Sequence, residues 1–187
     1  MAAVRAYLAQ SLDGFVAGPG DDLSWLPQPA EGDAVPASPD AGLGFSDFLS
    51  EVGALLMGRR TFDVVQGFGG PWPYGALPVL VATHRPLPPA PPQVRPVAGP
   101  ISDLVDAARA AAGDRDVYLD GPHLIRQALD AGLVDELILT VVPILLGAGV
   151  PLFSGIARRH TLRFTAHQGI APGMVQLRAQ VLPGPTP

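Results

Sequence analysis

The chain has 187 residues, 48% of them hydrophobic, and a formal net charge of −5, so we expect one domain, residues 1–187, with its own core. It contains no Cys and no Lys, which excludes disulfides, thiolate metal sites, a Schiff-base lysine and a Walker-type phosphate loop. The lack of a basic tail disfavours nucleic-acid binding, and the lack of a long apolar run disfavours a signal peptide or a membrane span. We therefore expect a cytoplasmic protein whose partner is a small molecule.

The secondary structure is predicted from short apolar runs and from the Gly, Pro and Asp residues between them. We expect strands at residues 4–10, 54–57, 79–81, 117–119, 136–142, 161–167 and 174–182, and a short strand around Val94. We expect helices at residues 45–52, 61–66, 102–112 and 123–131. Residues 18–44 are rich in Gly, Pro and Asp, which predicts a long loop that is either functional or disordered.

The order of these elements predicts an α/β fold. Short buried strands alternate with helices, which is typical of a mainly parallel sheet covered on both faces. The last two predicted strands would add a C-terminal antiparallel hairpin. We therefore expect a three-layer α/β/α arrangement whose central layer is a mostly parallel mixed sheet. In such sheets ligands bind beyond the carboxyl ends of the strands, and the turns that follow the strands become the candidate sites.

The turn after the predicted strand 54–57 is suited to a phosphate group. It contains Gly58, Arg59, Arg60 and Thr61. Glycine lets a ligand approach the backbone, the first amides of the following helix attract an anion, and the two guanidinium groups add charge. An ordinary strand-to-helix turn with solvated arginines is an equally acceptable interpretation of the composition.

The turn after the predicted strand 79–81 contains Thr83, His84 and Arg85. Its two basic residues could hold a second phosphate, such as the 2′-phosphate that distinguishes NADP from NAD. Exposed Arg and His residues are common where loops begin, so the composition alone is a weak signal.

The turn after the predicted strand 117–119 contains Asp120, Gly121 and Pro122, and His123 and Leu124 follow it. Gly121 permits close approach of a pyrophosphate, and Pro122 suits the first position of a helix. Asp120 could bond a ribose hydroxyl, although capping the helix is at least as good an interpretation.

Asp13 follows the first predicted strand and precedes a glycine. A carboxylate at this place could hydrogen-bond a substrate or relay a proton, whereas the Asp-Gly pair is also common in turns. The four His residues are scattered without the spacing of metal ligands, so no metal site is expected.

These motifs together resemble the dihydrofolate reductase-like family, and within it the stand-alone relatives of the riboflavin-biosynthesis reductase domain, the RibD C-terminal domain. The most specific part is Ala-Gly-Leu-Val-Asp-Glu-Leu at residues 131–137, followed by Leu-Gly-Ala-Gly at 146–149 and Pro-Leu-Phe at 151–153. The resemblance spans nearly the whole chain. It implies a homodimeric NADPH-dependent reductase of the dihydrofolate reductase fold. The expected reaction is hydride transfer to a C=N bond of a small heterocyclic, ribosylaminopyrimidine or pterin-type substrate.

Carried over position by position, the resemblance implies both a cofactor site and a substrate site. The implied cofactor residues are Val16, Ala17, Gly58, Arg59, Arg60, Thr61, Thr83, His84, Arg85, Asp120, Gly121, Pro122, His123 and Leu124. The implied substrate residues are Ser11, Asp13 and Trp25, with Asp13 as the candidate catalytic residue. The acid that dihydrofolate reductases carry on the helix after the first loop has no clear counterpart, and Asp47 is the nearest helical carboxylate. Two alternatives therefore stay open, a nucleotide-binding scaffold with weak catalysis and an interaction module.

Overall fold

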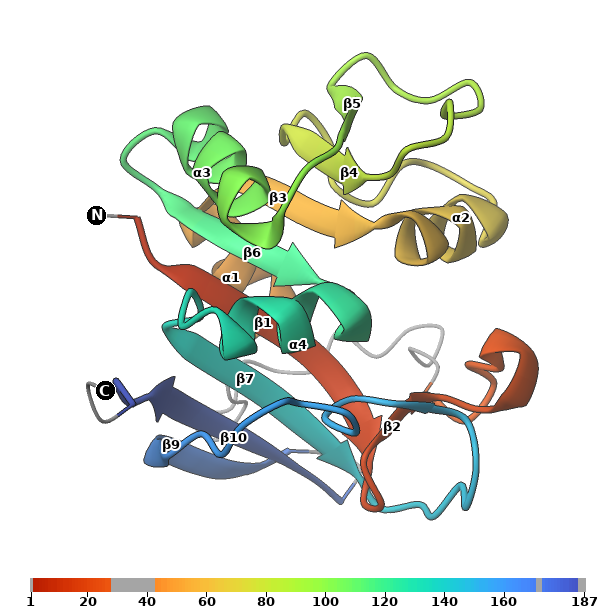
Figure 1. Ribbon diagram of the computed structural model, residues 1–187. Helices are drawn as coiled ribbons and strands as arrows, with labels where there is room; N and C mark the ends of the chain where they lie inside the picture. Colours follow the sequence, from red (N-terminus) through yellow and green to blue (C-terminus); the bar gives the residue numbers. More distant parts are fainter. Residues whose placement is uncertain (1, 28–42, 171–172, 185–187) are drawn as a thin grey trace.

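The computed structural model describes residues 2–27, 43–170 and 173–184, and an eight-stranded sheet forms its centre (Figure 1). The strands are β1 (Val4–Ser11), β3 (Val52–Gly58), β4 (Val79–Ala82), β5 (Val94–Val97), β6 (Asp116–Asp120), β7 (Glu136–Val142), β9 (Leu162–Ile170) and β10 (Met174–Val181). Their order is β5-β4-β3-β6-β1-β7-β10-β9. The first six strands in this order pair in parallel, whereas β10 pairs antiparallel with both β7 and β9. The predicted mixed sheet with its C-terminal hairpin is therefore confirmed.

Helices cover both faces of the sheet. They are α1 (Phe45–Glu51), α2 (Arg59–Gly67), α3 (Ile101–Ala112) and α4 (Pro122–Asp130). Helices α3 and α4 pack on one face, and α1 and α2 pack on the other, which confirms the three α/β/α layers. In the described ranges no helix combines the length and the apolar character needed to cross a membrane.

Two layers of apolar side chains hold the helices to the sheet. Leu56 and Leu119 belong to the core under α3 and α4, whereas Leu55, Met57 and Tyr118 belong to the core under α1 and α2. Successive residues of a strand point to opposite faces, so a strand covered on both sides must be apolar at nearly every position. This explains why β3 reads as an uninterrupted apolar run.

Three small elements were not predicted. They are β2 (Phe15–Ala17), the 3-10 helix η1 (Pro19–Asp21) and β8 (Val150–Pro151). Strands β2 and β8 pair with each other outside the main sheet, and segments this short carry no periodicity of their own. Residues 28–42 of the predicted loop lie outside the described residues.

A buried arginine ties the amino-terminal edge of the sheet together. Arg5 on β1 is 5% exposed and donates hydrogen bonds to Glu51, to Asp116 at 3.1 Å and to Glu136 at 2.8 Å. Its guanidinium also lies 5.1 Å from the centroid of the Phe48 ring. One cation therefore joins β1 to α1, β6 and β7. Its removal would leave Glu51 and Asp116 without a cation, whereas Glu136 would keep its ion pair with Arg178 at 3.0 Å.

Replacing Arg5 by Met is expected to lower the free energy of unfolding by about 3 kcal/mol, because the partner carboxylates lose their shared cation. Urea denaturation measures this change. The matched control is Arg95→Met, since Arg95 is exposed and should change stability by less than about 0.5 kcal/mol. Equal losses in the two variants would contradict the role given to Arg5.

Candidate active site

Two strand-to-helix turns meet at the carboxyl edge of the sheet. Strands β3 and β6 are parallel neighbours with Met57 opposite Asp120, so the turns that follow them lie side by side. A Cβ atom built on Gly121 would lie 2.5 Å from Thr61 Oγ1, and Gly121 has a φ of +98°. Only glycine fits this approach without displacing the neighbouring turn. The contact brings the N-terminal ends of α2 and α4 to the same place.

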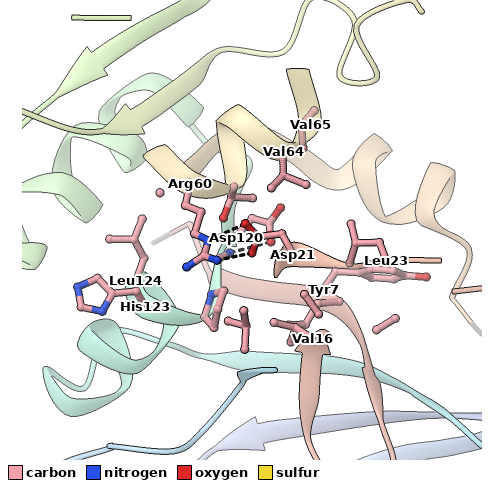
Figure 2. Close-up of a pocket in the computed structure, with 18 of the residues that line it drawn as sticks. Tyr7, Val16, Asp21, Leu23, Arg60, Val64, Val65, Asp120, His123 and Leu124 are labelled. Carbon is pink, nitrogen blue, oxygen red and sulfur yellow. Dashed lines mark hydrogen bonds and ion pairs between the residues drawn. The ribbon is translucent and has the colours of Figure 1, made fainter. Parts of the chain in front are cut away.

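A cavity of about 920 Å³ opens at this edge, and we call it the carboxyl-edge cavity (Figure 2). Its volume is within the range of ligand pockets, roughly 300–1,000 Å³. The predicted cofactor residues that line it are Val16, Ala17, Gly58, Arg59, Arg60, Thr61, Asp120, Gly121, Pro122, His123 and Leu124. The fold therefore gathers residues from β2, from the turn after β3 and from the turn after β6 into one space.

The two helix ends offer unpaired amides to this cavity. The first N–H groups of a helix have no acceptor within the helix, and no side chain caps α2 or α4. In α4, Pro122 has no N–H, and the N–H of Gly121 donates to Asp120 Oδ1 at 2.7 Å. The amides of His123 and Leu124, which belong to residues that line the cavity, therefore have no acceptor within the helix, and the same is true of the first amides of α2. This arrangement favours an anion such as a pyrophosphate.

Arg60 and Arg59 have different partners. Arg60 has a side chain that is 68% exposed, and both of its bonds to Asp21 measure 2.8 Å, as the dashed lines in Figure 2 show. Arg59 donates to Asp63 at 2.7 Å and to the carbonyl oxygen of Pro86 at 2.8 Å. Arg59 therefore fixes the turn after β4 against α2. Arg60 is held only by an exposed ion pair, which contributes about 0–1 kcal/mol and is readily exchanged.

The turn after β4 is outside the lining of the carboxyl-edge cavity. Ala82 lines the cavity, but Thr83, His84 and Arg85 do not. His84 and Arg85 are exposed, and within the described part of the chain neither side chain has a hydrogen-bond or ion-pair partner. The bond from Arg59 to the carbonyl oxygen of Pro86 ties the loop that contains these two basic residues to the start of α2, whose first residues line the cavity.

The predicted substrate residues Ser11 and Asp13 do not line the cavity. The buried Ser11 hydroxyl donates to Asp13 Oδ1 at 2.6 Å and accepts the N–H of Phe15 at 3.0 Å. Asp13 also accepts the N–H groups of Leu146 at 3.1 Å and Gly147 at 2.7 Å. The Ser11 hydroxyl and these amides lower the pKa of Asp13, so the carboxylate stays ionised near neutrality. These contacts join two loops and do not support Asp13 as the proton donor.

Trp25 is also outside the lining. Its indole N–H donates to the carbonyl oxygen of Asp22 at 3.0 Å, whereas the neighbouring Leu23 and Leu26 line the cavity. The segment around Trp25 therefore lines the cavity with Leu23 and Leu26 and not with the indole ring of Trp25.

Asp120 lines the cavity with a carboxyl group that is surrounded by protein atoms. Burial raises its pKa to about 6, and the Gly121 N–H and the Tyr118 hydroxyl oppose this shift only in part. Tyr118 and Asp120 are two positions apart on β6, so both point to the face of the sheet covered by α1 and α2. Asp120 is thus the lining carboxyl group whose protonation changes near neutral pH.

An aromatic part of the cavity was not predicted from the sequence. Tyr7, Phe45, Tyr74 and Tyr118 line it, and the Tyr7 and Phe45 ring centroids lie 5.4 Å apart. Burial raises the pKa of Tyr74 and Tyr118, which keeps both phenols neutral. The strand alternation of β6 could have placed Tyr118 beside Asp120, but no local pattern connects Phe45 to either. In the described ranges no cluster of His, Asp and Glu could hold a metal ion.

Replacing Gly121 by Ala is expected to destabilise the fold by more than its positive φ alone requires. Gly155 has a similar φ of +88° with nothing within 4 Å, so Gly155→Ala should cost about 1 kcal/mol. Gly121→Ala should cost about 2 kcal/mol more, because its methyl group meets Thr61. Thermal and urea unfolding measure both, and similar losses would argue against a tight turn contact.

Comparisons with known proteins agree with this architecture. Residues 78–176 match the family model of the RibD C-terminal domain. A candidate riboflavin biosynthesis protein from Shewanella sp. PV-4 is 31% identical with a TM-score of 0.81, and the match covers 97% of this chain and 99% of that one. The uncharacterised protein YwjB of Bacillus subtilis is 28% identical over 158 residues, 84% of this chain and 86% of its own.

A more distant structure shows the same fold alone. It is the Thermotoga maritima diaminohydroxyphosphoribosylaminopyrimidine deaminase/5-amino-6-(5-phosphoribosylamino)uracil reductase, which is 14% identical with a TM-score of 0.66. The match covers 97% of this chain and 57% of that longer protein. The resemblance inferred from the sequence is confirmed, and the chain belongs to the RibD C-terminal domain family.

Proposed function

We propose that the chain is an NADPH-dependent reductase that transfers a hydride to a C=N or similar bond of a small heterocyclic substrate. The observation that carries this proposal is the contact between Gly121 and Thr61, which joins two uncapped helix ends beside one large cavity. Membership of the family supports it, because the Thermotoga relative is named a reductase of a phosphoribosylaminouracil. The proposal includes the homodimer and the cytoplasmic setting that the resemblance implies.

The residues present fit a dinucleotide with an additional phosphate. The free amides of α2 and α4 suit the pyrophosphate, because two helix dipoles point their positive ends at it. Arg85 and His84, free and adjacent, suit the 2′-phosphate. Val16 and Ala17 also line the cavity, and their apolar side chains suit an uncharged nicotinamide ring. The bound cofactor supplies the hydride, and the protein orients the two reactants.

Asp21 competes with the cofactor for Arg60. The ion pair between them bridges η1 and α2 across the cavity. A phosphate that approaches the amides of α2 offers Arg60 a more highly charged partner than one carboxylate. We therefore propose that Arg60 exchanges Asp21 for a cofactor phosphate on binding.

Asp120 is the proposed proton donor in place of Asp13. Reduction of a C=N bond needs a proton on nitrogen, and a general acid works best when its pKa lies near the working pH. Asp120 meets this condition and lines the cavity, whereas the pKa of Asp13 is lowered and its carboxylate is engaged by two loops.

A nucleotide-binding scaffold with weak catalysis is the second candidate. One observation favours it: Ser11 and Asp13, the residues implied to face the substrate, are used for structural contacts instead. Such a scaffold would bind NADPH without oxidising it in the presence of heterocyclic substrates.

Calorimetric titration with NADPH and NADH tests the cofactor site. Arg85→Ala is expected to weaken NADPH binding about tenfold and to leave NADH binding unchanged, because only NADPH carries the 2′-phosphate. Asp21→Asn is expected to strengthen binding of both dinucleotides about two- to fivefold, because it frees Arg60. Asparagine also tolerates the positive φ of 63° at position 21.

Arg95→Ala serves as the charge-matched control, since Arg95 is exposed and outside the cavity. Equal weakening of NADPH and NADH by Arg85→Ala would remove the 2′-phosphate role. No binding of either dinucleotide by the unmodified chain would overturn the proposed function.

Asp120→Asn is expected to lower turnover at least tenfold with nearly unchanged NADPH affinity, because the amide cannot supply the proton. In the unmodified enzyme, turnover should fall as the pH rises through about 6, where Asp120 loses its proton. Steady-state kinetics across pH 5–9 measure both effects. Turnover that is unchanged in Asp120→Asn would exclude this role.

The Asp120→Asn variant should also change how the free energy of unfolding depends on pH. The pKa of Asp120 is raised in the folded chain, so its stabilising contribution is complete below the ordinary value of 3.8 and is lost by a pH of about 6. An asparagine cannot ionise, so Asp120→Asn avoids placing a charged carboxylate in the folded chain. The variant should therefore have a higher free energy of unfolding than the unmodified chain at pH 8, and the two should differ little near pH 4. Urea denaturation at the two pH values measures it.

A further inference from the structure

The charges around the carboxyl-edge cavity are distributed unevenly. Among the described residues, the basic side chains in its lining are Arg59, Arg60, His123 and Arg126, and all of them belong to α2 or α4. Figure 2 shows His123 and Leu124 on one side of the Arg60–Asp21 pair and Tyr7 and Leu23 on the other. The cavity therefore has a cationic end and an end without cations.

The sequence explains why the second end lacks cations. Residues 6–58 supply β2, η1, α1, β3 and the part of β1 that follows Arg5, and they contain no Arg, no Lys and no His. This half of the wall instead provides Tyr7, Leu23, Leu26 and Phe45, together with the carboxylate of Asp21. Helix α1 adds no positive charge to this end, because its first turn carries the acidic Asp47.

Two of the three arginines in the lining already have partners. Arg59 is bonded to Asp63 and Pro86, and Arg126 donates to the carbonyl oxygens of Pro151 at 2.7 Å and Leu152 at 3.1 Å. Arg60 is the exchangeable cation of the lining, and the proposed function assigns it to the cofactor. A second phosphate at the aromatic end would find no guanidinium to receive it.

The aromatic end is instead shaped for a flat, uncharged ring. Phe45 is 38% exposed and is braced by Tyr7 at 5.4 Å and by Tyr118 at 6.1 Å between ring centroids. The hydroxyl of Tyr118 donates to the carbonyl oxygen of Tyr7 at 2.9 Å, which locks that ring in place. Rigid aromatic faces favour stacking of a heterocycle, and the nearby Asp120 carboxyl group offers one hydrogen-bonding partner.

We infer that the substrate of this site is a planar heterocycle without a phosphate group, such as a free base or riboside, and not a phosphoribosyl compound. The inference rests on the proposed function, because it assigns the cationic end to the cofactor. A phosphomonoester carries close to two negative charges at neutral pH. Burying it against aromatic rings and Asp21 without a cation is strongly unfavourable.

Two matched ligand pairs test this inference by calorimetry in saturating NADP⁺. The first pair is 5-amino-6-(5-phosphoribosylamino)uracil, the compound named for the Thermotoga relative, and its dephosphorylated riboside. The second pair is FMN and riboflavin. In each pair the member without phosphate is expected to bind at least tenfold more tightly. Equal or tighter binding of a phosphorylated member, or binding of no member of either pair, would overturn the inference.

A pair of variants locates the effect at the aromatic end. Leu23→Arg supplies the missing cation and is expected to improve binding of the phosphorylated members about tenfold. Leu12→Arg makes the same change of charge at a residue that is 66% exposed and outside the lining, and it should leave the preference unchanged. An unchanged preference in Leu23→Arg would contradict the charge argument.

Titration with NADP⁺ alone separates the two proposals. If NADP⁺ does not bind but the riboside still binds better than its phosphate, the reductase proposal fails and the assignment of the aromatic end stands. If NADP⁺ binds and the phosphorylated ligands are preferred, the reductase proposal stands and the substrate class is wrong.

Discussion

The close approach of Gly121 to Thr61 is the contact on which the site depends. It exists because β3 and β6 pair in parallel and end at the same level, with Met57 opposite Asp120. Two helices then begin at adjacent points, and their unpaired amides face one space. A Cβ atom at position 121 would lie 2.5 Å from Thr61 Oγ1, so Thr61 would have to shift from its present position. Sheet topology and one missing Cβ atom together bring these two helix ends to the same place.

The basic side chains at the two edges of the sheet differ in how they are paired. At the amino edge, the single buried cation Arg5 is surrounded by Glu51, Asp116 and Glu136 and serves stability. At the carboxyl edge, the basic side chains of Arg60, His84 and Arg85 are exposed, and Arg60 has only an exposed ion pair with Asp21. A guanidinium group whose N–H donors are already bonded to carboxylates stabilises the fold, whereas one with free N–H donors is available to a ligand. This difference separates the structural edge from the candidate active site.

The motifs that identify the family include residues that position the site without lining it. Asp13 holds Leu146 and Gly147, and β8 pairs with β2, so the loop that contains the Leu-Gly-Ala-Gly motif supports Val16 and Ala17 from behind. Gly149 has a φ of +143°, and a Cβ atom there would overlap the carbonyl oxygen of Ala17. These contacts between two loops explain why Asp13 and the glycines at positions 147 and 149, which are far apart in the sequence, belong to one motif.

The sequence by itself determined the layered α/β fold, the parallel strands, the C-terminal hairpin and the strand-to-helix turns at residues 58–61 and 120–124. These features follow from local periodicity and from turn residues, which act over a few positions. Only the tertiary structure decided that Asp13 and Ser11 face a neighbouring loop, that Asp120 is half-buried in the cavity lining with a raised pKa, and that Phe45 joins the cavity. Those properties depend on atoms far away in the chain, because burial, desolvation and loop-to-loop hydrogen bonds arise only when distant segments pack together.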